Sequence, residues 1–249
     1  MEFLVQRFVV PIARKRRWKS ILEIGASMGD STDNLLKLPL SNYTIVDPCF
    51  DRDLAAKYAG DTRVNVLKCN SLDALAVGGA LRTGVEFDCI LIDGDHNWYT
   101  VFNELRLIRE RSLLRPGGYI FLHDVGWPYG RRDMYYQPES IPAEFRKAYS
   151  SKGMIPSLAS LHDGEGLNGQ YMNALEEGGP RNGVLTAVED FLAQHPRDYR
   201  FCWVRFEYGL GILQLRSGSL LAPAEFSWQR AKALAYSAKS SLRAALRSS

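Results

Sequence analysis

Residues 21–31 read Ile-Leu-Glu-Ile-Gly-Ala-Ser-Met-Gly-Asp-Ser, a short apolar run that ends in a glycine-rich turn. The run Ile21–Ile24 has the composition of a buried strand, and Asp30–Leu38 behind the turn has a helical pattern. Glycine in such a turn lets a small ligand approach the backbone where a side chain would block it. The stretch therefore predicts a strand, a ligand-binding turn and a helix. A tight turn without a ligand is the alternative.

The same alternation of apolar runs and helical patterns continues along the chain. Strands alternating with helices form parallel sheets covered on both faces. Two last runs, Arg200–Glu207 and Leu210–Leu215, stand too close for a parallel crossover and are expected to pair as an antiparallel hairpin. The sequence predicts a doubly wound α/β fold with a mostly parallel seven-stranded sheet that ends in this hairpin. The other expected strands are 43–46, 64–67, 87–92 and 119–122, the last after an Arg-Pro-Gly-Gly turn at 115–118, and further helices are expected at 72–81 and 101–113.

Length and composition fit one folded domain over residues 1–249. A chain with 46% hydrophobic residues can bury one sizeable core, which excludes a disordered chain. No window supplies the roughly 20 apolar residues of a membrane span. The four cysteines are scattered singly, and the basic cluster at 14–17 follows the apolar stretch at 3–12, whereas a signal peptide puts its charge first. A soluble protein of the reducing cytoplasm is expected.

Positive charge is concentrated at the two ends of the chain. Residues 1–19 hold six Lys or Arg and residues 221–249 hold five, each against a single Glu, although the net charge is only +3. The body between them is therefore acidic and lacks the basic stripe of a nucleic-acid-binding protein. Residues 223–249 are expected to form a basic surface helix. The basic ends are solvated helix faces, or they contact a phosphate-rich partner, a second subunit or an anionic membrane surface.

Carboxylates and amides stand beside the predicted ligand-binding turn. Glu23, two residues before Gly25, suits a cationic ligand, and Asp47 ends the second predicted strand, where a carboxylate can receive both hydroxyls of a ribose. Asn70 and Ser71 follow the third strand and can reach the edge of an adenine, although capping of the next helix explains them equally well. These residues predict a nucleotide pocket, and the Gly-x-x-x-Gly spacing differs from the dinucleotide fingerprint.

These motifs, together with Leu113-Leu-Arg-Pro-Gly-Gly118 and the terminal antiparallel pair, resemble the class I S-adenosylmethionine-dependent methyltransferases. The resemblance covers residues 20–124 and the final hairpin. It implies that adenine and ribose lie over strands two and three, and that the methionine part lies along the glycine-rich turn, where the start of the next helix suits a carboxylate. The cofactor contacts that it implies come from Glu23, Gly25, Ala26, Gly29, Ser31, Asp47, Asn70, Ser71 and Asp93.

Ionisable groups follow the fourth and fifth predicted strands. Asp93-Gly-Asp-His96 comes directly after one and His123-Asp124 after the other, so these side chains are expected at adjacent carboxyl ends of the sheet. Oxygen-rich clusters bind Mg²⁺ and leave positions open for substrate oxygens. A metal on a sugar diol lowers the pKa of a hydroxyl, and a neighbouring base can then remove its proton. A solvated acidic rim with capping aspartates is the alternative.

This second cluster resembles the metal-dependent sugar O-methyltransferases of antibiotic and polysaccharide biosynthesis, such as the macrocin, mycinamicin and novobiocin-sugar enzymes. The resemblance implies that Asp93 and Asp124 are ligands of Mg²⁺ or another divalent cation. It offers two candidates for the catalytic base, because His96 matches the histidine of some members and Asp95 the aspartate of others. His123 departs from the pattern, which is acidic in several relatives. It is a further metal ligand, a substrate contact or a hydrogen-bonded neighbour of Asp124.

A long irregular segment, residues 125–182, separates the fifth strand from the hairpin. Its part up to Pro180 holds 8 of the 21 Gly and 5 of the 11 Pro, and long segments at the carboxyl ends of strands often form substrate sites. Aromatic faces stack on sugar rings, and Arg or Asn side chains donate to hydroxyls or phosphates. Packed or ion-paired loop positions are the alternative reading of each residue. The side chains expected to contact a carbohydrate acceptor are Tyr129, Arg131, Tyr135, Arg181 and Asn182.

Three functions fit these observations. The first is an S-adenosylmethionine-dependent, Mg²⁺-assisted O-methyltransferase that acts on a hydroxyl of a sugar, oligosaccharide or glycosylated metabolite. The second is a methyltransferase of a phenol or an amine, and the third is a non-catalytic cofactor-binding module. Nucleic acid is not expected as a partner, whereas peripheral membrane contact and a homo-oligomer stay open. The third function is disfavoured because desolvated charges without a use are costly, and the chain retains Glu23, Asp47, Asp93, His96 and Asp124.

Overall fold

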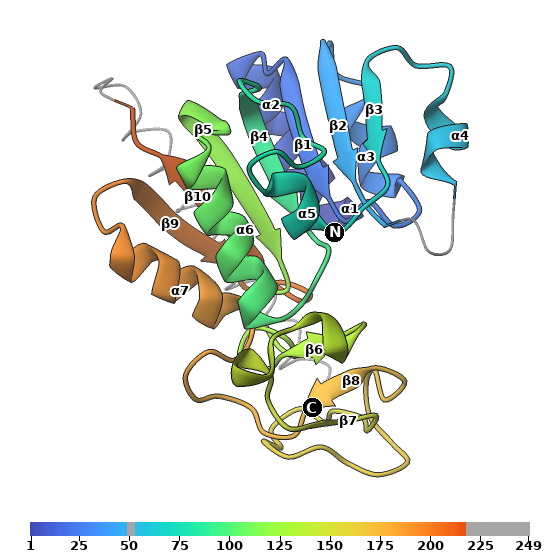
Figure 1. Ribbon diagram of the computed structural model, residues 1–249, viewed down its shortest axis with the longest axis vertical. Helices are drawn as coiled ribbons and strands as arrows, with labels where there is room; N and C mark the ends of the chain where they lie inside the picture. Colours follow the sequence, from blue (N-terminus) through green and yellow to red (C-terminus); the bar gives the residue numbers. More distant parts are fainter. Residues whose placement is uncertain (49–52, 218–249) are drawn as a thin grey trace, which may run out of the picture. The chain divides into compact units, whose positions relative to one another are not determined.

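The computed structural model of the chain describes residues 1–48 and 53–217. They form a seven-stranded sheet in the order β3-β2-β1-β4-β5-β10-β9, mostly parallel, with antiparallel strands at its end (Figure 1). The doubly wound fold predicted from the sequence is confirmed. The C-terminal helix predicted at 223–249 lies outside the described residues. The strands are β1 Ser20–Ile24, β2 Asn42–Val46, β3 Val64–Leu67, β4 Phe87–Ile92, β5 Leu114–His123, β9 Tyr199–Val204 and β10 Leu210–Leu215.

The described chain divides into two compact units. Unit 1 comprises Met1–Gly94, Glu104–Leu122 and Leu213–Ser217, and unit 2 includes Asp95–Asn103 and His123–Ile212. In unit 1, β1 pairs in parallel with both β2 and β4, and β3 and β5 extend the sheet outward from these two strands. Every residue of β1 is buried, as expected for a parallel strand with both faces covered.

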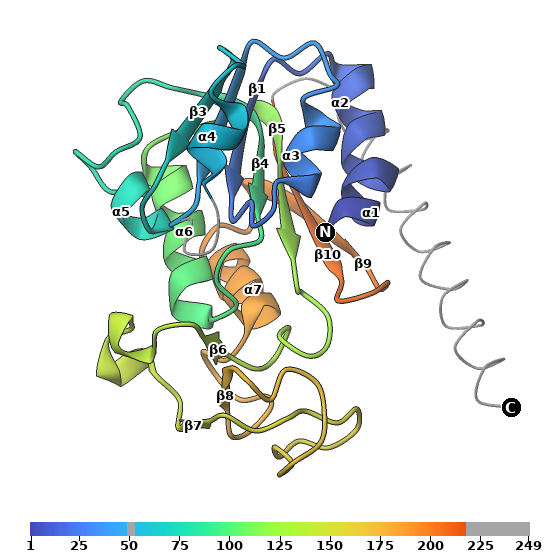
Figure 2. The same cartoon turned by 90° about the vertical axis from the view of Figure 1, so that its right-hand side faces the viewer.

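Short helices cover the sheet of unit 1. Helices α1, α2 and α3 lie on one face of this sheet, and α5 lies on the other face (Figure 2). Behind α2, the indole of Trp18 packs with its ring centroid 5.7 Å from Tyr119 and 6.3 Å from Phe121, two buried side chains of β5. These apolar contacts attach the N-terminal helices to the sheet. The elements are α1 Glu2–Leu4, the π-helix η1 Val5–Val9, α2 Val10–Arg16, α3 Asp30–Leu35, α4 Leu54–Tyr58 and α5 Ser71–Leu75.

The helix predicted at 72–81 is shorter than expected, because α5 ends at Leu75. The guanidinium of Arg111 donates hydrogen bonds to the carbonyl oxygens of Leu75 at 2.9 Å, Ala76 at 3.1 Å and Leu81 at 2.8 Å. These bonds satisfy carbonyls that a longer helix would have paired internally. Arg111 therefore holds the chain after α5, and Gly78, with φ +80°, also disfavours a longer helix.

The Arg-Pro-Gly-Gly turn predicted at 115–118 lies inside β5. Phe87 pairs with Leu114 and Cys89 pairs with Tyr119, so four residues of β5 stand opposite a single residue of β4. Gly117 has φ +80°, a conformation that suits glycine. The segment is a bulge within the strand and brings Ile120–Leu122 into register with the end of β4.

Unit 2 contains a small antiparallel sheet within the segment predicted to be irregular. Its strand order is β6-β8-β7, with β6 Met134–Tyr135, β8 Met172–Ala174 and β7 Tyr149–Ser150. The 3-10 helices η2 Pro138–Ser140 and η3 Ala143–Phe145 lie between β6 and β7. The unit also holds α7 Val184–Gln194 and the N-terminal part of α6 Trp98–Glu110.

One buried carboxylate joins the parts of unit 2. Asp133 Oδ1 accepts hydrogen bonds from the backbone N–H groups of Trp98 at 2.7 Å and Gly183 at 2.6 Å, and Oδ2 accepts one from the Tyr135 hydroxyl at 2.9 Å. Trp98 begins α6 and Gly183 precedes α7, so Asp133 anchors the start of both helices. Burial raises the pKa of this carboxyl to about 6.

Within the described part of the chain, every helix is too short or too polar to span a bilayer.

Candidate active site

The glycine-rich turn joins β1 to α3 and lies in unit 1. Gly25 has φ +80° and Gly29 has φ +83°. A Cβ on Gly25 would lie 2.4 Å from the carbonyl oxygen of Asp93, and a Cβ on Gly29 would lie 2.1 Å from the hydroxyl of Tyr58. Contacts within the protein already require both glycines, so the sequence argument, which attributed them to the approach of a ligand, explains them incompletely.

The carboxylate of Asp47 supports this turn. Its Oδ2 accepts hydrogen bonds from the backbone N–H groups of Ala26 at 2.8 Å and Ser27 at 3.0 Å. Ser27 has φ +49°, which a non-glycine residue adopts only when its surroundings hold it there. Asp47 therefore fixes the backbone of the turn, a role that the sequence spacing did not reveal. Its contact with a ribose stays a prediction.

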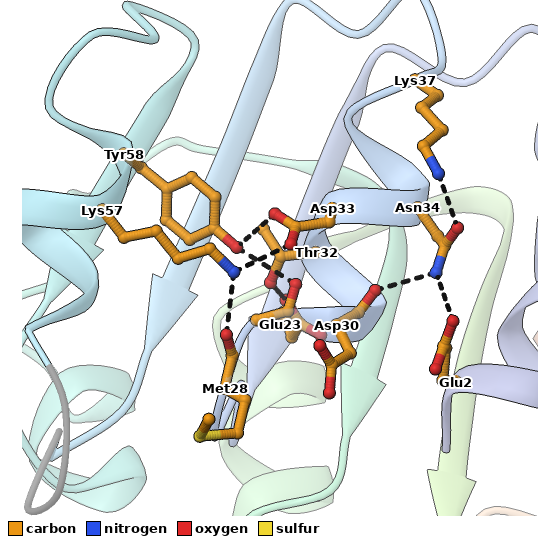
Figure 3. Close-up of polar contacts among 11 residues, drawn as sticks. Glu2, Glu23, Met28, Asp30, Thr32, Asp33, Asn34, Lys37, Lys57 and Tyr58 are labelled. Atoms are coloured by element: carbon orange, nitrogen blue, oxygen red, sulfur yellow. Dashed lines mark hydrogen bonds and ion pairs between the residues drawn. The ribbon is translucent and has the colours of Figure 1, made fainter.

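Glu23 points into the interior of unit 1, which corrects the prediction that it offers a negative charge to a cationic ligand. The residue is 2% exposed, and its Oε2 accepts hydrogen bonds from the hydroxyls of Tyr43, at 2.7 Å, and Thr32. Burial raises its pKa to about 7, because the charged form is poorly solvated there. Glu23 therefore ties β1 to β2 through Tyr43 and to α3 through Thr32. Figure 3 shows Glu23 beside Thr32.

The other predicted cofactor residues lie at the carboxyl ends of β1 and β3. Ser31 is buried in the first turn of α3. Asn70 is exposed and precedes α5, but its side chain makes no capping hydrogen bond in the structure, so capping does not account for it. Ser71 is the first residue of α5. The strand order reverses between β1 and β4, and ligands of doubly wound folds bind at such a point. The turn, Asp47 and Asn70 thus fit a nucleotide-like cofactor.

Carboxylates and imidazoles gather beyond the ends of β4 and β5. Ile92 pairs with Leu122 in parallel, so the residues that follow them leave the same edge of the sheet. Asp93, His96 and Asp124 each offer one potential metal-ligand atom, and these atoms lie within 4.8 Å of one another. Two carboxylates suit Mg²⁺, and an imidazole widens the choice to transition metals. The donor chemistry therefore fits a divalent cation.

Asp124 forms the centre of the part of this cluster that lies in unit 2. Its Oδ2 lies 3.2 Å from His96 Nδ1 and 2.9 Å from His123 Nδ1. The residue is 5% exposed and has φ +59°. Burial acts to raise the pKa of Asp124, but the neighbouring His96 and His123 outweigh it and hold the pKa below the ordinary value. The carboxylate is therefore kept charged between two imidazoles.

His123 fits one of the three roles considered for it. Among the described residues, the potential metal ligands that gather are Asp93, His96 and Asp124, and His123 is outside that group. Its Nδ1 instead hydrogen bonds to Asp124. The prediction that His123 ligates the metal is not supported, whereas the hydrogen-bonded neighbour of Asp124 is what the structure shows.

The ring of His96 is held on several sides in unit 2. It stacks on Tyr129, with centroids 5.3 Å apart and planes 6° apart, and its Nε2 lies 3.4 Å from the Tyr136 hydroxyl. With Nδ1 toward Asp124 and Nε2 toward Tyr136, the two ring nitrogens have different partners. The charge of Asp124, 3.2 Å from Nδ1, favours the tautomer with its proton on Nδ1, which leaves the lone pair on Nε2.

Asp95, the other candidate base, is hydrogen bonded to the start of α6. Its Oδ2 accepts a hydrogen bond from the hydroxyl of Thr100 at 2.9 Å. Burial raises its pKa. The Asp95 carboxyl is thus hydrogen bonded to the first turn of α6. The geometry therefore favours His96 over Asp95 as the base.

The structure corrects two predicted acceptor contacts. Tyr135 is 1% exposed, and its hydroxyl donates to Asp133 and accepts from the backbone of Lys147 at 2.9 Å. Asn182 is 2% exposed, and its amide bonds only to backbone groups, at 2.7 to 3.0 Å. Both side chains are buried and hydrogen bonded within unit 2, so they hold the segment together and do not face a ligand.

The remaining predicted contacts are also engaged with the protein. Arg131 makes a bidentate ion pair with Glu189, at 2.6 and 2.8 Å. The guanidinium of Arg181 lies over the rings of Trp98 and Phe145, 5.4 and 5.3 Å from their centroids. Tyr129 is 3% exposed but forms the surface on which His96 stacks. Of the predicted set, Tyr129 is therefore the one that contacts a predicted catalytic residue.

Sequence reasoning missed Tyr136, which follows the buried Tyr135 directly. Its side chain is 50% exposed, its hydroxyl contacts His96, and its ring meets the edge of Tyr171 at a centroid distance of 5.6 Å. An exposed aromatic ring beside the imidazole can receive the flat face of an acceptor. The only signal in the sequence was the Tyr-Tyr pair, which did not show which of the two faces outward.

Comparison with known proteins agrees with the fold. Residues 22–125 match the model of a family described as a methyltransferase domain. No curated protein sequence matches the chain. The match spans less than half of the chain, and it shows that this stretch is similar to methyltransferase domains, in agreement with the doubly wound sheet.

Two similar solved structures share this fold. One is a Podospora anserina methyltransferase bound to S-adenosylhomocysteine, with 18% identity and a TM-score of 0.52 over 83% of this chain and 75% of that one. The other is the Burkholderia thailandensis 1,6-didemethyltoxoflavin N1-methyltransferase, with 15% identity and a TM-score of 0.50 over 84% of this chain and 76% of that one. At these identities the likeness concerns the fold.

Proposed function

We propose that the protein transfers a methyl group from S-adenosylmethionine to a hydroxyl of a sugar, oligosaccharide or glycosylated metabolite. His96 is the general base, Asp124 orients it, and a divalent cation such as Mg²⁺, held by Asp93 and Asp124, assists. The observation that carries this proposal is the 3.2 Å contact between His96 Nδ1 and Asp124 Oδ2, with Nε2 on the side of the exposed Tyr136.

His96 and Asp124 act as a pair. Asp124, whose Oδ2 lies 3.2 Å from Nδ1 of His96, favours the tautomer with its proton on Nδ1, in which Nε2 can take the proton of an acceptor hydroxyl. The carboxylate then stabilises the imidazolium that forms, as an oriented carboxylate does in other acid–imidazole pairs. Bound S-adenosylmethionine supplies a methyl group on a sulfonium centre as the electrophile. A cation at Asp93 and Asp124 would supply a Lewis acid that lowers the pKa of a coordinated hydroxyl.

A carbohydrate acceptor is supported by the aromatic surroundings of His96. Tyr136 and Tyr171 meet edge to face, and both expose part of their rings. Sugar rings stack on such faces while their hydroxyls meet polar groups. A flat phenol would also stack there, so a panel of acceptors has to decide between the two classes.

The test measures S-adenosylhomocysteine release with nucleotide sugars, simple glycosides, catechols and amines as acceptors. We expect turnover with a sugar acceptor and a methyl ether in the product. Turnover confined to phenols or amines would overturn the carbohydrate assignment. Turnover that survives exhaustive chelation unchanged would remove the cation from the proposal, whereas loss on chelation and recovery with Mg²⁺ would support it.

Variants of the two candidate bases test the mechanism. His96→Ala should lose about 10²- to 10⁴-fold in turnover, the usual cost of removing a positioned base. Its affinity for S-adenosylhomocysteine should stay unchanged, which shows that the cofactor site is intact. Asp95→Asn is the matched control and should remain within a few fold of the unmodified protein. The opposite pattern, in which Asp95→Asn is inactive and His96→Ala is not, would show that the base is misassigned.

A further inference from the structure

Two side chains of α4 reach the glycine-rich turn from outside. Lys57 Nζ donates to the carbonyl oxygen of Met28 at 2.8 Å and to Asp33 Oδ2 at 2.8 Å. The hydroxyl of Tyr58 lies 2.9 Å from Asp33 Oδ1 and 3.1 Å from the carbonyl oxygen of Gly29, and can donate its hydrogen to either. Figure 3 shows both side chains converging on Met28 and the first turn of α3.

Both the N–H groups and the carbonyl groups of the turn therefore form hydrogen bonds with side chains. Its N–H groups at Ala26 and Ser27 bind Asp47, and its carbonyls at Met28 and Gly29 bind α4. Asp47 closely follows β2, and α4 comes a few residues later. The segment after β2 thus supplies every one of these bonds. Ser27, with its positive φ, lies in the middle of the stretch that they fix.

The space around Gly29 also indicates that α4 packs against the turn. A Cβ at this position would lie 2.1 Å from the Tyr58 hydroxyl and 2.7 Å from Lys57 Nζ. Tyr58 is 8% exposed, so it is packed in place, whereas the Lys57 side chain is 37% exposed at the rim. The contact needs a glycine on one side and these two side chains on the other.

We propose that Lys57 and Tyr58 are positioning residues for the cofactor, which act on the turn through Met28, Gly29 and Asp33. The inference rests on the assignment of S-adenosylmethionine to this turn. If a ligand binds only molecules in which the turn is ordered, its apparent Kd is the intrinsic Kd divided by the ordered fraction. The bonds from α4 raise the ordered fraction before the ligand arrives, and so reduce the entropy lost on binding.

The test measures the affinity of the full chain for S-adenosylhomocysteine by calorimetry. Lys57→Met and Tyr58→Phe should each weaken binding by about 5- to 20-fold, through a smaller binding-competent fraction. Lys57→Arg keeps a donor for Asp33 and Met28 and should recover most of the affinity. The matched control is Lys37→Met, which removes an exposed lysine bonded to Asn34 of α3 and should leave the affinity within about twofold, as for other surface charges.

A double-mutant cycle separates positioning from direct contact. Asp33→Ala should also weaken binding, and the double variant Asp33→Ala/Lys57→Met should lose less affinity than the sum of the two single losses, because both changes break the bond between Lys57 and Asp33. Each change also breaks one bond of its own, Lys57 to Met28 or Tyr58 to Asp33. The proposal is overturned if Lys57→Met weakens binding while neither Asp33→Ala nor Tyr58→Phe does, since the bonds from α4 to the turn would then not matter and Lys57 would contact the ligand itself. It is also overturned if none of the variants changes affinity.

Two further measurements keep these outcomes separate from other failures. Urea unfolding of the ligand-free variants shows whether the fold itself is weakened. If Lys57→Met fails to fold, the milder Tyr58→Phe and Asp33→Ala decide by the same affinity criterion. Absence of S-adenosylhomocysteine binding by the unmodified protein would refute the cofactor assignment, a result distinct from unequal binding by the variants.

Discussion

Replacing Glu23 by glutamine should remove a large pH-dependent contribution to the stability of unit 1. The carboxyl is buried between β1, β2 and α3, with the Tyr43 hydroxyl 2.7 Å from Oε2. Burial raises its pKa from 4.5 to about 7. At about 1.4 kcal/mol for each tenfold change in proton affinity, the difference between folded and unfolded chain amounts to about 3 kcal/mol.

The sign of the effect follows from the direction of this pKa. The folded state holds the proton of Glu23 more tightly than the unfolded state, so the stabilisation is fully present below pH 4.5 and is lost as the pH rises through 7. Glutamine cannot ionise. The free energy of unfolding of the unmodified protein should therefore fall, relative to that of Glu23→Gln, by about 3 kcal/mol across this window.

Urea unfolding followed by tryptophan fluorescence between pH 4 and 8 measures this difference. Glu86→Gln is the matched control, because it removes a carboxyl whose side chain is 51% exposed in the same unit. If the curves for Glu23→Gln and for the unmodified protein run parallel over the whole range, the carboxyl titrates alike in the folded and unfolded chain. The assignment of Glu23 to a buried, proton-retaining position would then be wrong.

Two other substitutions test separate parts of the structure. Asp47→Ala removes the acceptor of two turn N–H groups and should weaken S-adenosylhomocysteine binding by about 1–3 kcal/mol, measured by calorimetry; equal affinity would refute the role of Asp47. Asp133→Asn should remove a stabilisation that is complete below pH 3.8 and lost as the pH rises through about 6. Thermal unfolding at pH 4 and pH 7 checks it, and the argument fails if the variant and the unmodified protein lose stability equally over this interval.

The main sheet could be predicted from the sequence because its signals are local. Ile21–Ile24 and Phe87–Ile92 are apolar runs bounded by glycine or aspartate, and parallel strands covered on both faces have this composition. The strands of the small sheet in unit 2 are two or three residues long, too short to show any periodicity. They form because Asp133 and Asn182 bond to backbone groups from distant parts of the chain, which no local pattern reveals.

The residues of the site were predictable, but the direction of each side chain was not. Asp93, His96 and Asp124 follow neighbouring strands, and the sequence indicated that they would gather. Adjacent residues of a strand face opposite sides, so a strand of unknown register leaves both possibilities open. Tyr135 is 1% exposed and Tyr136 is 50% exposed, and the sequence argument chose the buried member of this pair. The inward direction of Glu23 could not be predicted either, because every residue of β1 is buried and the strand shows no alternation of buried and exposed positions.

Asp124 is the residue on which both the base and the cation of the proposed reaction depend. One of its oxygens lies within 3.2 Å of Nδ1 of both His96 and His123. A cation held by this carboxylate would draw on the same negative charge that orients His96. The two roles are therefore coupled at Asp124, whereas Asp93 enters the proposal through the cation alone.

This coupling predicts different responses to Mg²⁺ in two variants. Asp93→Asn should lose turnover at low Mg²⁺ and recover part of it as the concentration rises, because the base and its partner remain and only cation affinity falls. Asp124→Asn should stay about 10²-fold or more below the unmodified protein at every concentration, since it loses the charge that stabilises the imidazolium. If Mg²⁺ restores both variants alike, Asp124 serves the cation alone. If Asp93→Asn keeps full turnover without added metal, the base needs no cation, and the pair of His96 and Asp124 accounts for proton removal by itself.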